Sequence, residues 1–328
     1  MNPWERIIRD TPATANPMEE GARLVLRTSA SLRAGEKVLV VADETTLPVG
    51  EEFVAAARSL GADPVLVLIR SRAADGEEPP EPTGTAMAAS DLIVLVTSHS
   101  LTHTHARRGA NRAGARVISI PGVTEEMLRE GGLAADWTQI HDVVRRVARR
   151  LRGAHEVRLT SAAGSDLTFS VAGRDWVTED TGLCSRKGAF TTLPAGELLV
   201  APVEGSAAGR LVADTYFEEP LLEPATVTLK EGHAMRILGA AKAVHAMNRG
   251  GRDGRALGRF GFGLNPRARI AGPHLEAEKA LGSAHLGFGD NLVLGGKIHC
   301  GVRVECIVSE VGVEVDGDPV IEKGRLVD

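Results

Sequence analysis

The chain has 328 residues, of which 43% are hydrophobic, and its formal net charge is −5. This length is enough for a sizeable buried core and predicts two domains. No apolar run reaches eighteen residues, the N-terminus lacks the apolar stretch of a signal peptide, and the basic residues form no global footprint. We therefore expect no membrane span, no secretion and no nucleic-acid partner.

The cysteines favour a reducing compartment. Cys184, Cys300 and Cys306 show neither the spacing of a zinc site nor that of a disulfide framework. Cys300 and Cys306 are expected to be small buried hydrophobic residues. Together with the composition, this predicts a cytoplasmic protein.

Residues 1–153 are predicted to form an α/β domain. An apolar run at 35–43 is bounded by turn residues, an amphipathic helix follows at 47–62, and residues 63–69 are rich in β-branched side chains. The alternation of helix and strand continues over 84–122. It indicates a doubly wound parallel sheet covered on both faces. No glycine-rich phosphate loop follows these strands, so a nucleotide cofactor is not supported.

Residues 154–328 have a different pattern and are predicted to form a β-rich domain. An amphipathic helix over 136–154 leads into it, and the basic run "VRRVARRLR" in that helix is typical of a solvated face. Beyond it, short strands alternate with glycine-rich turns, and "AAKAVHAMNRGG" gives one helical patch. The pattern predicts an α+β, barrel-like domain, which also holds most of the unusual polar residues.

One segment of this half, "GGKIHCGVRVEC" at 295–306, is predicted to be a strand with one polar face. Because strand side chains alternate, His299, Arg303 and Glu305 would share that face, and apolar residues would occupy the other. Such a face suits an ion, a charged ligand or bulk water. A strand that places ligands at alternate positions directs them at one ion.

Other candidates lie upstream in the same half. Glu197 opens an apolar strand, His274, Glu276 and Glu278 lie on a predicted short helix, and His285 lies in "SAHLGFGDN". Taken singly, they are also typical of a rim carboxylate, solvated charges and a hydrogen-bonded core histidine. As a set, imidazole and carboxylate are the ligands of zinc, cobalt or manganese hydrolases, and two histidines with one carboxylate are the ligands of non-heme Fe(II).

Several long segments, in order, resemble the aminopeptidase T family of metallopeptidases. They include "GEKVLVVADETTLPVGEEFVAAARSLGA", "LPAGELLVAPVEGSAAGRLVAD", "GFGLNPRARIAG" and "LEAEKALGSAHLGFGDN". The resemblance covers roughly residues 20–320 and is strongest to the branch described as leucyl aminopeptidase-like. The iron enzyme 2,5-dihydroxypyridine 5,6-dioxygenase is similar to this family too. The resemblance implies an α/β N-terminal domain, a β-rich domain that carries the metals, and a homodimer.

The resemblance also implies ligands, residue by residue. Glu197 matches the first glutamate ligand, His285 matches a histidine ligand, and Glu278 is a possible second glutamate. The family ends its site with His-x-Asp, where this chain has Arg303, Val304 and Glu305. The carboxylate is kept, but a guanidinium that stays protonated replaces the imidazole.

His299 is the alternative source of that imidazole. On a regular strand it would lie about 13 Å from position 303, so a bulge or a different ion position would be required. The other alternative is that Arg303 pairs with Glu305 or with a substrate carboxylate, because arginine holds carboxylates bidentately. The site would then be weakened, reduced to one ion, or lost.

These expectations give three functions. The first is a hydrolase of small peptides or amino-acid amides, with Zn, Co or Mn held by Glu197, His285 and Glu305, Arg303 binding a carboxylate or developing charge, and Glu278 as base. The second is a mononuclear Fe(II) oxygenase that uses His285, His299 and Glu305. The third is a binding protein whose metal site is lost.

Overall fold

The computed structural model describes residues 16–327, which form two compact units. The first unit holds the described residues up to Asp142 together with Asp180–Ala195 and Pro266–Ala268, and the remaining described residues form the second unit. No helix within residues 16–327 is both long and apolar enough to cross a membrane.

The first unit is built on a five-stranded parallel sheet in the order β2-β1-β3-β4-β7. Its strands are β1 (Lys37–Ala42), β2 (Asp63–Leu68), β3 (Leu92–Val96), β4 (Arg116–Ser119) and β7 (Phe190–Thr192). Its helices are α2 (Pro17–Leu24), the π-helical η1 (Val25–Ser29), α3 (Leu47–Ser59), α4 (Glu81–Ala88), α5 (His105–Ala113) and α6 (Glu125–Arg129). α7 (Trp137–Arg150) begins in this unit and continues into the second.

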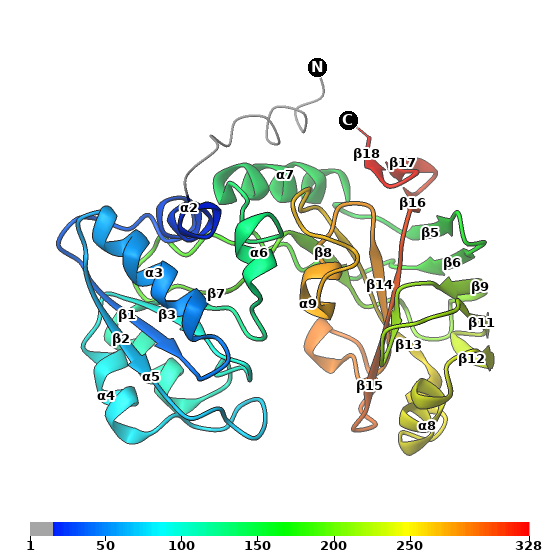
Figure 1. The fold of residues 1–328 in the computed structure, drawn as a ribbon. Helices are drawn as coiled ribbons and strands as arrows, with labels where there is room; N and C mark the ends of the chain where they lie inside the picture. The colour runs from blue at the N-terminus through cyan, green and yellow to red at the C-terminus, as the bar shows by residue number, and fades with distance from the viewer. Residues whose placement is uncertain (1–15, 328) are drawn as a thin grey trace. The chain divides into compact units, whose positions relative to one another are not determined.

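Helices cover both faces of this sheet, and the apolar side chains of the strands alternate accordingly. Leu39 belongs to a core cluster that includes Met87 of α4 and Ala110 of α5. The opposite face meets α3, where a Cβ added at Gly50 would lie 3.0 Å from the Cβ of Ala42. Figure 1 shows α3 on one side of the sheet and α4 and α5 on the other. The predicted doubly wound arrangement is present.

The second unit contains two antiparallel sheets, which have the strand orders β10-β15-β14-β13-β8 and β12-β11-β9-β6-β5-β16-β17-β18. The five-stranded sheet consists of β8 (Glu197–Val200), β10 (Tyr216–Phe217), β13 (Leu257–Gly263), β14 (Ala284–Gly289) and β15 (Arg303–Val308). The eight-stranded sheet consists of β5 (Glu156–Ser161), β6 (Asp166–Ser170), β9 (Ala208–Ala213), β11 (Ala225–Lys230), β12 (His233–Leu238), β16 (Val311–Val315), β17 (Asp318–Glu322) and β18 (Arg325–Leu326). The helical segments are α8 (Ala241–Arg249), η2 (Asp253–Arg255), α9 (His274–Ala277) and η3 (Leu292–Leu294).

The five-stranded sheet has one apolar face and one face with space for polar side chains. Phe260 pairs with Leu286, which pairs with Cys306, and all three are fully buried. The neighbouring positions on the opposite face include Gly261 and Gly287. The repeated Gly-Phe-Gly pattern of β13 and β14 therefore directs aromatic rings into the core and leaves the other face open.

The prediction that residues 295–306 form one strand is wrong, because β15 begins only at Arg303. Gly295 and Gly301 have φ of 79° and 75°, a left-handed conformation that interrupts an extended chain. The Asp290 carboxylate also accepts hydrogen bonds from the backbone N–H groups of Cys300 and Gly301 and holds this segment as a loop.

Candidate metal centre

The open face of the five-stranded sheet gathers charged side chains from four strands. Arg259 of β13 pairs through Gly287 of β14 with Glu305 of β15, so the three positions form one row. In the next row, His285 of β14 lies opposite Gly261. A Cβ added at Gly261 would lie 2.2 Å from His285 Nε2, so the imidazole occupies the space that this glycine leaves.

Glu197, His285 and Lys279 form one buried group. Glu197 opens the edge strand β8, and its Oε2 lies 2.7 Å from His285 Nε2. Its other oxygen, Oε1, lies 2.7 Å from the ammonium of Lys279. The His285 side chain is fully buried, and the other two side chains are 7% exposed. Lys279 also lies 3.5 Å from Glu278 Oε2, so its ammonium stands between two carboxylates.

The environment keeps both carboxylates ionised. Burial alone would raise the pKa of Glu197, but Lys279 and His285 outweigh burial and hold this pKa below its usual range. For Glu278, burial is again the largest effect, and Lys279, His285 and His274 together outweigh it and lower the pKa. Each carboxylate is therefore negatively charged at neutral pH and available to a cation.

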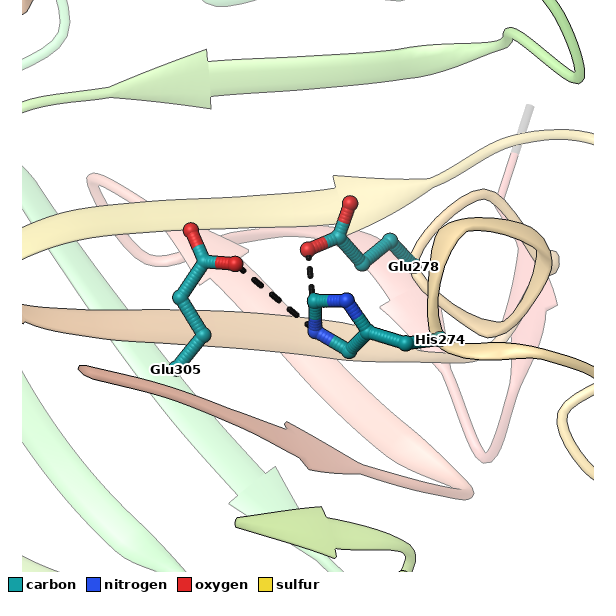
Figure 2. Close-up of side chains that lie close together, drawn as sticks. All are labelled: His274, Glu278 and Glu305. Carbon is teal, nitrogen blue, oxygen red and sulfur yellow. Dashed lines mark ion pairs between the residues drawn. The ribbon is translucent and has the colours of Figure 1, made fainter. Parts of the chain in front are cut away.

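His274, Glu278 and Glu305 form a second group, shown in Figure 2. His274 begins the short helix α9, and Glu278 directly follows this helix, so the two are spaced i, i+4 on one side. His274 Nε2 lies 3.3 Å from Glu278 Oε1 and 3.7 Å from Glu305 Oε2. One ligand atom from each residue lies within 4.8 Å of the others.

Two arginines flank Glu305. Arg259 Nη1 lies 3.3 Å from Glu305 Oε1 and reaches it across Gly287, which has no side chain. Arg303 Nε lies 3.2 Å from the same oxygen, and its side chain is 57% exposed. The largely buried Arg259 therefore orients the Glu305 carboxylate from the protein side. Arg303 presents a guanidinium to solvent beside the same carboxylate.

Tyr216 packs against the imidazole of this second group. Its ring centroid lies 4.3 Å from that of His274, with the planes tilted by 35°. Burial raises the pKa of Tyr216, and Glu218 and Glu305 raise it further. The phenol therefore stays protonated at neutral pH and offers an O–H group beside the imidazole.

The second group fits a divalent metal. Within the described part of the chain, His274 Nε2 and Glu305 Oε1 are buried and form no hydrogen bond. Both atoms have only longer ion-pair contacts, at 3.2 Å or more, and a cation held by His274, Glu278 and Glu305 would add a direct ligand contact at this group. One imidazole nitrogen and two carboxylate oxygens are suitable donors for iron, manganese or zinc.

The structure distributes the predicted ligands over two groups. Glu305 lies in the three-ligand group, together with Glu278, which we predicted to be a base. Glu197 and His285 lie beside each other and beside Lys279. His299 lies apart, in the loop before β15, where its side chain is 75% exposed and its Nδ1 is 3.7 Å from Asp290 Oδ1.

Sequence reasoning named His274 among the polar candidates but left it out of the ligand set, and it gave no role to Lys279 or Arg259. The i, i+4 spacing of His274 and Glu278 was a usable signal for a shared ligand face. Nothing comparable marks Lys279, because its partner Glu197 is far away in the sequence. The position of Arg259 follows from strand register, which depends on tertiary pairing.

The comparisons with known proteins agree with this fold. The family model NicX, described as 2,5-dihydroxypyridine 5,6-dioxygenase, matches residues 22–328. The chain belongs to this family. No curated protein matches the chain.

Two solved structures share the fold of this NicX family member. The 2,5-dihydroxypyridine dioxygenase from Pseudomonas putida KT2440 is 20% identical, with 94% of this chain and 96% of that chain covered and a TM-score of 0.69. Wild-type AmpT from Thermus thermophilus is 18% identical, with 95% and 99% covered and a TM-score of 0.66. The predicted fold class is confirmed, and the chain is an enzyme-like metal protein of the NicX and aminopeptidase T fold. The aminopeptidase T resemblance holds for the fold, while the matched family is the dioxygenase one.

Proposed function

We propose that this protein is a mononuclear, metal-dependent dioxygenase that opens a small hydroxylated ring. The observation that carries the proposal is the place of Lys279, 2.7 Å from Glu197 and 3.5 Å from Glu278. In aminopeptidases of the two-metal type, the ions lie about 3.5–4 Å apart and share such carboxylates. Here the ammonium of Lys279 already pairs closely with Glu197, and Glu278 remains with His274 and Glu305 in one three-ligand group for one ion.

His274, Glu278 and Glu305 would hold that ion. When bound, Fe(II) would supply the redox chemistry that activates molecular oxygen, as in non-heme iron oxygenases. Arg259 fixes the orientation of Glu305, because its guanidinium lies 3.3 Å from Oε1. The NicX family match adds support for oxygen chemistry over hydrolysis.

Other residues around the ion would bind the substrate. Arg303 is 57% exposed beside Glu305, so its guanidinium is placed to hold an anionic oxygen of a hydroxylated ring or its carboxylate. Tyr216, packed on His274, adds an aromatic surface and a protonated phenol next to the ligand group. This combination suits a planar, anionic ring better than an extended peptide.

The test is oxygen uptake by protein reconstituted with Fe(II) under anaerobic conditions and then mixed with 2,5-dihydroxypyridine and related hydroxylated rings. We expect one O₂ consumed per ring, loss of the aromatic absorbance, and no need for an added reductant. Matched samples loaded with zinc should consume none. Lack of oxygen uptake with every ring, in protein that retains stoichiometric iron, would contradict the proposal.

A metal-dependent hydrolase of small peptides or amino-acid amides is the second candidate. The observation in its favour is the carboxylate-rich ligand set, since carboxylate oxygens also suit manganese and zinc. Release of amino acids from amides by the zinc, cobalt or manganese form, without oxygen, would support it. Absence of stoichiometric metal after reconstitution would instead support a binding protein whose metal site is lost.

A further inference from the structure

A cavity in the second unit is lined by none of the residues of the metal centre. It has a volume of ≈ 390 Å³ and lies between the C-terminal part of α7 and the segment after β6. Its lining includes four arginines, Arg145, Arg149, Arg152 and Arg174, and one acidic residue, Asp175. The volume falls within the range of small-molecule sites. The cavity is therefore large enough for a ligand and strongly basic.

The spacing of these arginines brings them to one side of the helix. Arg149 follows Arg145 by four positions, and Arg152 lies three positions further on, in the turn after α7. Like charges at such spacing destabilise a helix. Attraction to the negative end of the helix dipole explains why Arg149 is favourable near the C-terminus of α7. The dipole does not explain the position of Arg174, which lines the same cavity from another segment.

Two of the arginines are held in place by protein partners. Arg145 Nη1 donates a hydrogen bond to Thr178 Oγ1 at 3.3 Å, and its Nη2 lies 2.9 Å from Glu179. Arg174 forms an ion pair with Glu204, and its side chain is only 11% exposed. These contacts hold the side chains of Arg145 and Arg174 in position in the absence of a ligand.

The other two arginines have no protein partner within residues 16–327. Among the described residues, the exposed side chains of Arg149 and Arg152 form no ion pair and no hydrogen bond. Trp176 also lines the cavity and is held edge-on by Phe260 and Phe262, at centroid distances of 6.3 Å and 5.9 Å. Its indole Nε1 is buried and lacks a hydrogen-bond partner within residues 16–327.

We propose that this cavity binds a small molecule that carries a phosphate or pyrophosphate group. Two unpaired guanidinium groups are balanced by one doubly charged anion, which a single chloride or monocarboxylate does not provide. Planar guanidinium forks match phosphate oxygens bidentately. Arg145 and Arg174 add positive charge from fixed positions.

The test is calorimetric titration of the full chain with inorganic pyrophosphate at constant ionic strength, with sodium chloride and succinate as comparison ligands. In the double variant Arg149→Ala/Arg152→Ala we expect affinity at least about tenfold weaker, because charge-assisted hydrogen bonds are lost. The control is Arg210→Ala/Arg249→Ala, which removes two exposed arginines elsewhere in the same unit. We expect this control to bind like the natural chain.

Tryptophan emission gives a second readout. Pyrophosphate should change the emission of the natural chain but not that of Trp176→Phe, which loses the indole that lines the cavity. Equal losses of affinity in both double variants would show that pyrophosphate responds to the summed positive charge of the unit and not to this cavity. That result would overturn the proposal. Unchanged affinity in Arg149→Ala/Arg152→Ala, or tighter binding of succinate than of pyrophosphate, would overturn it as well.

Discussion

Lys279 Nζ lies 2.7 Å from Glu197 Oε1, and both side chains are only 7% exposed. A buried carboxylate needs a compensating charge, and this ammonium supplies it without a metal. Because the same ammonium lies 3.5 Å from Glu278, one residue links the Glu197–His285 group to the three-ligand group. The charge balance of both groups therefore depends on Lys279.

Replacing Lys279 by methionine should lower the free energy of unfolding by about 3 kcal/mol or more, since Glu197 would keep a buried charge without its cation. Urea denaturation measures this loss. Lys242→Met is the matched control, because Lys242 is 60% exposed and lies 3.9 Å from Glu219. An exposed pair of this kind contributes about 0–1 kcal/mol. Similar effects of the two substitutions would show that the Lys279 ammonium does not hold the buried carboxylate.

Removing a ligand should reduce the bound metal. In His274→Ala and in Glu305→Gln we expect metal per chain, counted by elemental analysis after reconstitution and desalting, to fall to a small fraction of the natural value. His299→Ala should keep the full amount, because His299 lies in the loop before β15 and is 75% exposed. If His299→Ala lost the metal and His274→Ala kept it, His299 would be a ligand and the assignment of His274 would be refuted.

Changing Arg303 to histidine should separate metal binding from substrate binding. The new imidazole would lie two positions before Glu305 and restore the His-x-carboxylate order, so metal affinity should rise. Loss of the guanidinium should raise KM for an anionic ring by about tenfold. Stability should change by no more than about 0.5 kcal/mol, since the side chain is 57% exposed. A KM that stays unchanged would exclude Arg303 from substrate binding.

The parallel sheet could be predicted from the sequence because the patterns that indicate its strands and helices are local. Apolar runs such as 37–42 alternate with an amphipathic helix that begins near Pro48 and ends before Gly61, and both boundaries are visible in the residues themselves. The short strand β7 carries no such pattern, and its place beside β4 follows only from tertiary pairing.

The candidate site was harder to predict, because its geometry depends on contacts distant in the sequence. Glu305 could be placed from its match to the family motif. His299 could not, because two glycines with positive φ and the hydrogen bonds of Asp290 convert the expected strand into a loop. The pairing of Lys279 with Glu197 joins residues more than eighty positions apart, and no spacing rule reports it.

Acid should destabilise the first unit partly through Asp43. Burial tends to raise the pKa of Asp43, but hydrogen bonds from Ser98 and Thr45 outweigh it and lower the pKa. The unfolded chain therefore binds the proton more readily, so this stability is present above the unfolded pKa of about 4 and is lost as pH falls through the lower folded value. Asp43→Asn should flatten the decline in urea midpoint between about pH 5 and pH 2.5. An identical decline in the variant would show that Asp43 does not contribute.

Adding one methyl group at Gly261 should disturb the site through His285. The new Cβ would lie 2.2 Å from Nε2 and 2.5 Å from Cε1 of the imidazole, and the ring is fully buried, so the ring and its contact with Glu197 must shift. We expect Gly261→Ala to lower the free energy of unfolding by about 1–3 kcal/mol. Gly109→Ala in α5 is the control, because no atom lies within 4 Å of its added Cβ, and it should instead stabilise by about 0.5–1 kcal/mol. If both variants gained stability in urea, the space at Gly261 would not be what positions His285.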